Sequence, residues 1–229
     1  MGSIIKTGLA LVAFTACTLA GMAQKNDLTR QKLKGTIKTV TELEYAVVAG
    51  AKEPVKDTLK VKGVCKYNAD GNRTEYVTYS AAGAVLSRSV FSYNDSGMLV
   101  NVKRYRGDGG LNVTTTYKYD KAGNETEESN TDPSGTEFMT GKSRYDLKGN
   151  RIVYDRYNQF GHLFLKSNFK FDKKGNEIEE REFDSHQSLQ FRTTFEYDNY
   201  DKKGNWLWRV TYKNDMPRTI VEREIGYGQ

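Results

Sequence analysis

The side chains that most often carry catalysis are scarce in this 229-residue sequence. Its two histidines, His162 and His186, stand next to expected turns, and neither has a Cys, Asp or Glu at the spacing of a metal site. No glycine-rich phosphate loop opens a helix. We therefore expect no metal, no cofactor and no catalytic triad.

Cysteine chemistry is also limited, because the chain has only Cys17 and Cys65. Cys17 lies in an N-terminal segment that we expect to be removed. Cys65 lies in an alternating apolar row, where a core position is a simpler interpretation than a nucleophile. A single remaining cysteine gives no disulfide framework, so the packing of repeats must hold the protein together.

Carboxylates are abundant, with 29 Asp and Glu residues, but no spacing singles out two of them as a glycosidase pair. We therefore assign no catalytic residue. An enzyme with a diffuse carboxylate site is the third of our functional hypotheses.

The two tryptophans mark the most distinctive candidate binding surface. In the segment NWLWRVTY, strict alternation puts Trp206, Trp208, Val210 and Tyr212 on one face of a strand near the C-terminus. Coplanar aromatic rings on an exposed sheet suit stacking against sugar rings or against an apolar patch of a partner. The alternative is that this face covers the last buried layer of the sheet.

Residues 1–23 have the pattern of a secretory signal peptide, with a basic start, an apolar stretch and a small-x-small cleavage site. We expect the mature chain to be exported to a periplasmic or extracellular location, without a transmembrane segment. The minor alternative is a lipoprotein anchored at Cys17. Residues 24–32 are expected to form a polar arm, and residues 33–229 a single domain.

An aromatic residue followed four positions later by glycine recurs along most of the chain. The pattern is clearest in the phrases YDKAGN, YDLKGN, FDKKGN and YDKKGN. Its copies are spaced alternately by 12 and 14 residues over most of the chain, so the period is 26 residues with two different halves. A period of this length indicates a repeat architecture.

The segments before the stronger turns alternate in character with a period of two residues. In VLSRSVFSY (85–93), LNVTTTYKY (111–119) and LFLKSNFKF (163–171), large residues at the ends and a small residue in the middle share one face. This alternation predicts β-strands with one buried face. The segment 137–145 fits poorly, and there we expect a weak strand.

The repeated Asp-x-x-Gly phrase has the composition of a turn. Asp in the first position bonds the backbone of the turn, and Gly in the fourth takes the positive φ with which the strand resumes. The phrase lacks the series of acidic ligands of a calcium loop. The residues assigned this structural role are Asp120, Gly123, Asp146, Gly149, Asp172, Gly175, Asp201 and Gly204.

The charge distribution favours a solvated sheet face. The formal net charge is +6, but residues 67–229 carry 24 basic and 24 acidic side chains, so the basic excess lies ahead of them. Cations at outward positions, such as Lys118 and Lys170, would face glutamates if consecutive strands pair. We adopt cross-strand ion pairing over a basic binding stripe, and we expect no nucleic-acid partner.

The alternating Tyr-Asp-x-x-Gly-Asn and aromatic-x-x-x-Gly phrases resemble the YD repeats of RHS-type proteins, which are secreted and surface proteins of bacteria. The resemblance covers about residues 59–216 and is specific through its repetition. The chain departs from the usual pattern in having Asn where many YD repeats have Arg, and it lacks the conserved core-associated and toxin segments. It resembles the short, stand-alone members with a signal peptide, for which the family implies a β-meander and sometimes carbohydrate binding.

These observations predict an all-β fold, an antiparallel β-meander of about a dozen strands that forms a twisted open sheet or a partly curled barrel. The leading functional hypothesis is a non-catalytic extracytoplasmic module that binds a glycan or a cell-envelope component, with the two tryptophans and Tyr212 as ligand contacts. The alternative is a structural or assembly protein that pairs with a partner protein through exposed strand edges.

Overall fold

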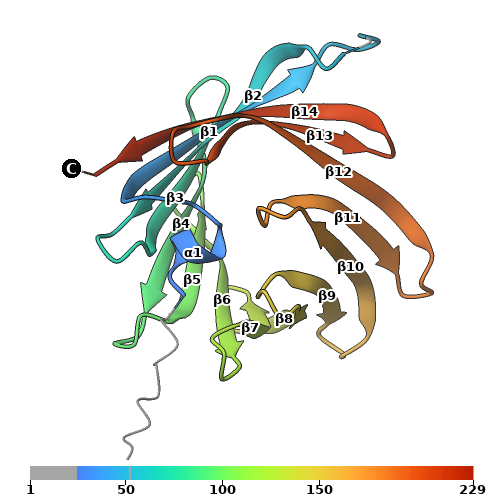
Figure 1. Ribbon diagram of the computed structural model, residues 1–229. Coiled ribbons are helices and arrows are strands. Elements are labelled where there is room, and N and C mark those ends of the chain that lie inside the picture. Colours follow the sequence, from blue (N-terminus) through green and yellow to red (C-terminus); the bar gives the residue numbers. More distant parts are fainter. Residues whose placement is uncertain (1–24, 52, 229) are drawn as a thin grey trace, which may run out of the picture.

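The computed structural model describes residues 25–51 and 53–228, which form a ring of strands with one short helix (Figure 1). The signal peptide expected at residues 1–23 lies outside the described residues, as does Cys17. No helix in the described chain is long and apolar enough to cross a membrane.

The described elements follow one another in simple sequence order. They are α1 (Asp27–Arg30), β1 (Ile37–Val47), β2 (Lys56–Tyr67), β3 (Arg73–Ser80), β4 (Val85–Tyr93), β5 (Leu99–Arg106), β6 (Leu111–Tyr119), β7 (Glu125–Thr131), β8 (Glu137–Tyr145), β9 (Arg151–Asn158), β10 (Leu163–Phe171), β11 (Glu177–Asp184), β12 (Leu189–Tyr200), β13 (Trp206–Lys213) and β14 (Met216–Tyr227).

The sheet is a closed barrel in which each strand pairs antiparallel with its neighbours in sequence. Strand β1 closes the ring, because it pairs with β14 on one side and with β2 on the other. The expected antiparallel meander is therefore confirmed. Of the two shapes expected for it, the partly curled barrel is the nearer, and the twisted open sheet with exposed edges is wrong, since none of the fourteen described strands has a free edge.

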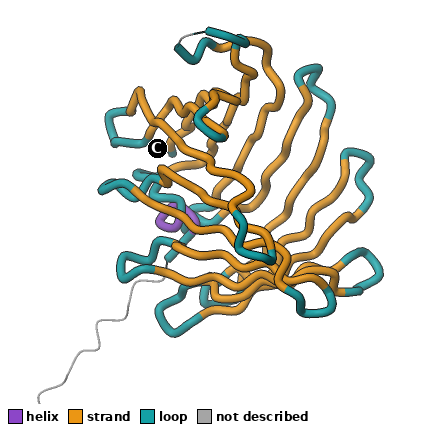
Figure 2. Tube along the Cα trace, turned by 90° about the vertical axis from the view of Figure 1, so that its right-hand side faces the viewer, coloured by secondary structure: helices purple, strands orange, loops and turns teal. Residues whose placement is uncertain are grey.

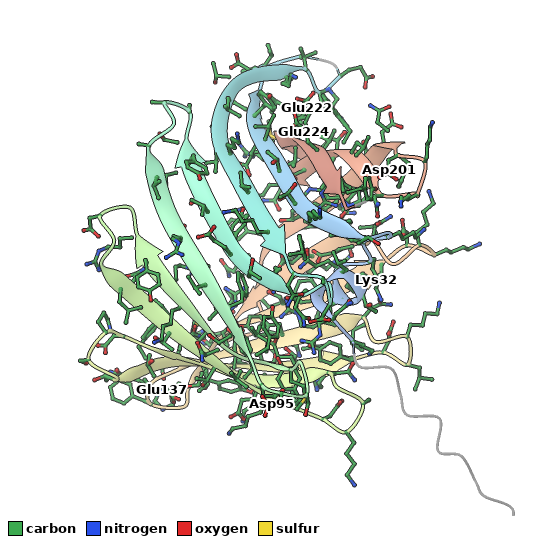
Figure 3. The ribbon with its side chains drawn as sticks, turned by 90° about the vertical axis from the view of Figure 1, so that its left-hand side faces the viewer. Lys32, Asp95, Glu137, Asp201, Glu222 and Glu224 are labelled. Carbon is green, nitrogen blue, oxygen red and sulfur yellow. The ribbon has the colours of Figure 1, made fainter. Side chains whose placement is uncertain are left out.

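The two kinds of turn lie at opposite ends of the barrel because successive strands run in opposite directions. One end carries the turns 68–71, 94–97, 120–123, 146–149, 172–175 and 201–204, and we call it the capped end. We call the other end of the barrel the open end. Figure 2 shows the loops gathered at the strand ends. In Figure 3, Lys32 and Asp201 lie on the side of the capped end, and Glu137 lies on the opposite side.

The capped-end turns have the internal bonding that the sequence predicts. The Asp120 carboxylate accepts hydrogen bonds from the backbone N–H groups of Ala122 and Asn124, at 2.8 and 2.9 Å, and from the Asn124 side-chain amide at 2.9 Å. Gly123 has a φ of +73°, which a residue with a Cβ adopts only with strain. Equivalent bonds hold the turns that begin at Asp146, Asp172 and Asp201.

Residues 25–36 run across the capped end and form what we call the strap, with α1 near its middle. The helix starts at Asn26, whose side-chain oxygen accepts a hydrogen bond from the N–H of Thr29. The polar arm expected at 24–32 is thus, in its described part, an ordered segment that packs on the barrel. In Figure 1, α1 lies inside the outline of the ring of strands.

The strap is anchored most strongly at Asp27, which is only 2% exposed. Its carboxylate accepts hydrogen bonds from the backbone N–H of Arg73 at 2.9 Å, from the Arg73 guanidinium at 3.3 Å, and from the hydroxyl of Tyr93. Because a buried carboxylate needs compensation for lost hydration, this bonding fixes the start of the strap against β3 and β4.

Further strap contacts reach turns that are far apart around the ring. The Arg30 guanidinium donates to the carbonyl of Gly123 at 3.3 Å. The backbone N–H of Lys34 donates to the side-chain oxygen of Asn205 at 2.8 Å, and the Asn205 amide donates back to the Lys34 carbonyl at 3.0 Å. The N–H of Leu28 donates to the carbonyl of Gly71 at 3.1 Å, so the strap ties the first, third and last of the capped-end turns together.

The main apolar core lies under the strap. It is formed by the buried side chains Leu28, Leu33, Ile37, Val40, Cys65 and Tyr67. Cys65 is buried in this core, so its expected core position is confirmed. Burial raises the pKa of its thiol, so the thiolate is disfavoured.

Glycines in the middle of β2 and β8 make room for aromatic rings on the next strand. A Cβ added at Gly63 would collide with the ring of Tyr76, and one added at Gly141 would collide with the ring of Tyr154. Gly141 lies in β8, where a weak strand was expected. The strand is instead nine residues long, because the ring of Tyr154 occupies the space that the glycine leaves.

Ion pairs cross the outer face of the barrel as expected. Glu75 pairs with Lys66 at 2.8 Å and with Arg88 at 2.6 Å, and Lys118 pairs with Glu127 at 2.5 Å. These residues come from adjacent strands, so the prediction of cross-strand pairing on a solvated face is confirmed.

Candidate functional site

Between the strap and the barrel wall lies a cavity of about 600 Å³. Its walls come from three sources: the strap, the capped-end turns, and the inward side chains of strands on several sides of the ring. This volume lies within the range of small-molecule binding sites, which is about 300 to 1,000 Å³.

One repeat position supplies a side chain to the cavity from every double repeat. It is the second residue after the glycine of each capped-end turn, where the next strand begins. In the first five repeats, a β-bulge at the start of the new strand shifts the register beside this position, because two of its residues oppose one residue of the preceding strand. The six residues are Arg73, Leu99, Glu125, Arg151, Glu177 and Trp206, and all six line the cavity.

Aromatic rings form much of the remaining wall. Trp206 is 8% exposed, and its ring lies 5.3 Å from that of Tyr197 at an interplanar angle of 55°. The Arg223 guanidinium lies 3.3 Å from the centroid of Trp206, on the same side of the barrel. Tyr117, Tyr145 and Phe169 also line the cavity.

The structure separates the three residues predicted to share a binding face. Trp206 lies in the cavity wall, and alternation along β13 puts Trp208 on the face opposite the cavity residue Arg209. Tyr212 lies on the same face as Trp208, where its hydroxyl donates to Glu196 at 2.8 Å. The prediction of a single aromatic face is therefore wrong.

The physical reason is an irregularity at the end of β12. Asn199, which pairs with neither tryptophan, has a φ of +51°. This left-handed residue interrupts the alternation beside Trp206, the first residue of β13.

Two cavity arginines are paired with carboxylates. Arg73 pairs with Asp27 at 3.3 Å, and Arg223 pairs with Glu42 at 2.5 Å. Both partners lie in the strap or in β1, so these pairs join the first residues of the described chain to the barrel wall.

Two other cavity arginines contact aromatic rings instead. The Arg151 guanidinium lies 4.8 Å from the centroid of Tyr154 and 5.4 Å from that of Phe169. The Arg209 guanidinium lies 5.3 Å from the centroid of Trp206. Neither forms an ion pair with a carboxylate in the described chain.

Two glutamates of the cavity wall have pKa values raised to about 7. Burial is the largest cause for both, and the second cause is the glutamate three residues later, Glu128 for Glu125 and Glu180 for Glu177. Arg151 acts in the opposite direction on both groups. Each carboxyl is thus perturbed by burial and by a second carboxyl of its own strand.

The predicted turn glycines have a second role at the cavity. Gly123, Gly149 and Gly175 all line its rim, beside the asparagines that follow them. Sequence reasoning identified the turns but not the charged residues that enter the cavity, although the fixed offset from each turn glycine was available as a signal.

The donor set does not suggest a metal centre. Within residues 25–51 and 53–228, no group of three or more His, Cys, Asp or Glu side chains is placed to hold a metal ion.

Comparison with known proteins gives likenesses of shape only. The sequence matches no protein-family model and no curated protein. Among solved structures, the chain is similar to a porin-like protein from Bacteroides uniformis, with 11% identity, a TM-score of 0.47, and coverage of 83% of this chain and 98% of the other.

Two other solved structures show weaker likeness. A putative outer membrane lipoprotein-sorting protein domain from Vibrio parahaemolyticus has 11% identity and a TM-score of 0.39, and the match covers 87% of this chain and 90% of that one. A Photorhabdus luminescens Tc holotoxin pore has 13% identity and a TM-score of 0.30, over 80% of this chain and 12% of the other. Since all three TM-scores are below 0.5, we draw nothing about function from them.

Proposed function

We propose that this protein is a non-catalytic, extracytoplasmic binding protein that takes a glycan or a cell-envelope component into the cavity at the capped end of its barrel. The observation that carries the proposal is the wall of that cavity. Aromatic faces and charged or polar side chains converge there from many strands, and one repeat position contributes from every double repeat.

The chemistry of the wall fits a sugar. Sugar rings present C–H faces that stack on aromatic rings and hydroxyl groups that need hydrogen-bond partners. Trp206 and Tyr197 supply adjacent rings, while Arg209 and the Glu177 carboxyl supply polar groups at the same wall. Such a mixture of rings and a few placed polar groups is typical of small-molecule sites.

The charged side chains on the outer face of the barrel support a location of this face in water. Charged pairs such as Lys118–Glu127 and Lys170–Glu179 stand on it, and a charge facing lipid at mid-membrane costs about 2–4 kcal/mol for Arg or Lys. With the signal peptide expected at residues 1–23, this favours an envelope location for the protein. The resemblance to short secreted YD-repeat proteins points in the same direction.

A binding role is proposed over an enzymatic one because aromatic and cationic side chains make up much of the cavity wall. The raised pKa values of Glu125 and Glu177 arise from burial and from the glutamate three residues later on the same strand.

The test is a titration of residues 24–229 carrying Trp208→Phe, which leaves Trp206 as the only tryptophan. We expect neutral and acidic oligosaccharides of the envelope to include at least one that changes the Trp206 emission in a saturable way. Calorimetry on Trp206→Ala is expected to show at least tenfold weaker binding, because the stacking surface is lost.

Trp208→Ala is the matched control, since this ring lies on the opposite face of the same strand. Its affinity should equal that of the unchanged protein. Binding that is lost in Trp208→Ala and kept in Trp206→Ala would move the site to the outside of the barrel, and failure of every oligosaccharide to bind would reject the proposal.

A further inference from the structure

Three arginines of the cavity, Arg30, Arg151 and Arg209, form no ion pair with a carboxylate in the described chain, and Arg30 already donates to the Gly123 carbonyl. Resting on the proposed function, we propose that Arg151 and Arg209 bind an acidic group of the ligand, so that the cavity selects glycans bearing a carboxylate or sulfate.

The placement of the two guanidiniums supports this role. They come from β9 and β13, and Glu177 on β11 lies within the electrostatic influence of both. Aromatic rings pack against each guanidinium, Phe169 at 5.4 Å from Arg151 and Phe195 at 5.4 Å from Arg209. Stacking on a ring fixes the plane of a guanidinium and leaves its N–H groups free to donate at the edge.

The hydrogen bonding of Arg209 is incomplete. Its Nε atom is buried and has no hydrogen-bond partner in the described chain. Buried polar atoms are almost always bonded, so this unpartnered donor leaves the hydrogen bonding of the guanidinium unsatisfied at the cavity wall.

Glu177 is the acidic group that both arginines influence, and its surroundings reduce the negative charge that it offers them. Burial and Glu180 raise the pKa of Glu177 to about 7, so a large part of this carboxyl is neutral near neutral pH. In its neutral form it donates a hydrogen bond through its O–H instead of competing for the guanidiniums. A carboxylate or sulfate bound at a guanidinium would then meet little competition from this carboxyl.

The remaining charges of the cavity also favour an anion. Eight cationic side chains line it against three acidic ones. Asp27 is engaged by Arg73, and Glu42 neutralises Arg223. Lys25, Lys32 and Lys148 stand among the strap and rim residues, where they attract an anionic ligand toward the opening.

The experiment compares oligosaccharides that differ only in charge. Uronate oligosaccharides, such as trigalacturonate, are titrated by calorimetry beside their methyl esters, which keep the rings and lose the negative charge. Sulfated oligosaccharides form a second arm and distinguish the two sources of the acidic group. We expect one acidic series to bind at least tenfold tighter than its neutral counterpart, because hydrogen bonds between charged groups are about twice as strong as neutral ones.

Arg151→Met and Arg209→Met remove the charge and keep most of the side-chain volume. Each is expected to weaken acidic ligands at least tenfold and to leave the affinity for neutral ones within about twofold, and Arg151→Lys is expected to recover part of the loss. Arg144→Met, on the outer face of β8, is the matched control and should bind like the unchanged protein. Urea unfolding of each variant establishes that the barrel has formed.

The outcomes separate the two proposals. If acidic and neutral oligosaccharides bind with equal affinity, the arginine site is overturned and glycan binding remains. The same conclusion follows if acidic oligosaccharides still bind to Arg151→Met and Arg209→Met with unchanged affinity. If no oligosaccharide of either kind binds, the proposed function fails and this inference fails with it.

Discussion

At the scale of single residues, the cavity shows how one repeat position can carry different chemistry in each copy. The second position after the glycine of each capped-end turn holds arginine twice, glutamate twice, leucine once and tryptophan once. The backbone fixes the direction of the side chain, so its identity is free to vary with the ligand. Repetition therefore builds the frame, and variation at one position builds the site.

The buried glutamates make stability depend on pH. The pKa of Glu177 is about 7 in the folded protein, against 4.5 for an ordinary glutamate, so the folded state holds this proton more tightly. The stabilising contribution is fully present below pH 4.5 and is lost as the pH rises through 7. We expect the free energy of unfolding to fall between pH 5 and pH 8 by up to about 3 kcal/mol for this group.

Glu177→Gln removes the ionisation and keeps the shape. Urea unfolding followed by circular dichroism should find the variant about 2–3 kcal/mol more stable than the unchanged protein at pH 8 and nearly equal to it at pH 4.5. Glu127→Gln, on the outer face, should change stability by less than about 1 kcal/mol at both pH values. If Glu177→Gln changes the free energy of unfolding by the same amount at pH 4.5 and at pH 8, the pKa of Glu177 is not raised in the folded protein.

At the scale of elements, the turns allow a test within the chain. Asn68 and Asn158 stand where other turns have aspartate, and their side-chain oxygens accept from the same backbone positions. Asp172→Asn should therefore cost less than about 1 kcal/mol of unfolding free energy. Asp172→Ala should cost about 1–3 kcal/mol, because it leaves the turn amides without an acceptor.

Thermal and urea unfolding of both Asp172 variants provides the comparison. Equal destabilisation by Asn and Ala would show that the negative charge matters and that the hydrogen-bond acceptor does not. If Asp172→Ala leaves the free energy of unfolding unchanged, the hydrogen bonds within the turn do not contribute to stability.

The small residues inside the barrel are expected to be sensitive to added volume. Gly63→Val places a side chain against the ring of Tyr76, and we expect this overpacking to lower the free energy of unfolding by about 1–3 kcal/mol. Adding Tyr76→Leu should recover part of the loss, since the ring that causes the collision is gone. If the double variant is no more stable than Gly63→Val, the loss of unfolding free energy comes from a change in the backbone and not from the collision with the ring.

At the scale of the whole molecule, the strap and the closing strand convert a repeat array into one unit. Strand β1 pairs with the last strand, and the strap joins turns from separated repeats. An open array of repeats has only nearest-neighbour contacts, so its ends fray. The closed ring has no end strand, and we expect a single cooperative unfolding transition.

Asp27 connects the strap to this ring. Asp27→Ala leaves Arg73 without its carboxylate, and loss of one partner of a buried ion pair typically costs about 3–5 kcal/mol. We expect faster amide hydrogen exchange and protease cleavage within residues 26–33, measured by mass spectrometry. Asp70→Ala, whose exposed side chain lies in the first capped-end turn, is the control and should leave the strap protected.

Unchanged protection of residues 26–33 in Asp27→Ala would show that the apolar contacts of Leu28 and Leu33 hold the strap alone. General acceleration of exchange in every strand would instead show that the strap is required for the barrel to remain closed.

The sequence by itself determined the local structure. Alternation with a period of two residues predicts strands, and Asp-x-x-Gly phrases predict the turns, because both depend on residues close together in the chain. The outer ion pairs follow from the same pattern once consecutive strands pair. Strand β8 also follows the repeat. Its Gly141 departs from the alternating pattern because the ring of Tyr154 fills the space at that position.

Only the tertiary structure decided how the sheet ends and where the site lies. Pairing of β1 with β14 joins residues about 180 positions apart, such as Glu42 and Arg223, and the alternation of each strand is the same in an open sheet and in a closed one. The direction of Trp206 depended on an irregularity beside it, since a shift of one residue moves a side chain to the other face. Closure, the strap and the cavity arise from contacts between distant segments, and no local pattern encodes them.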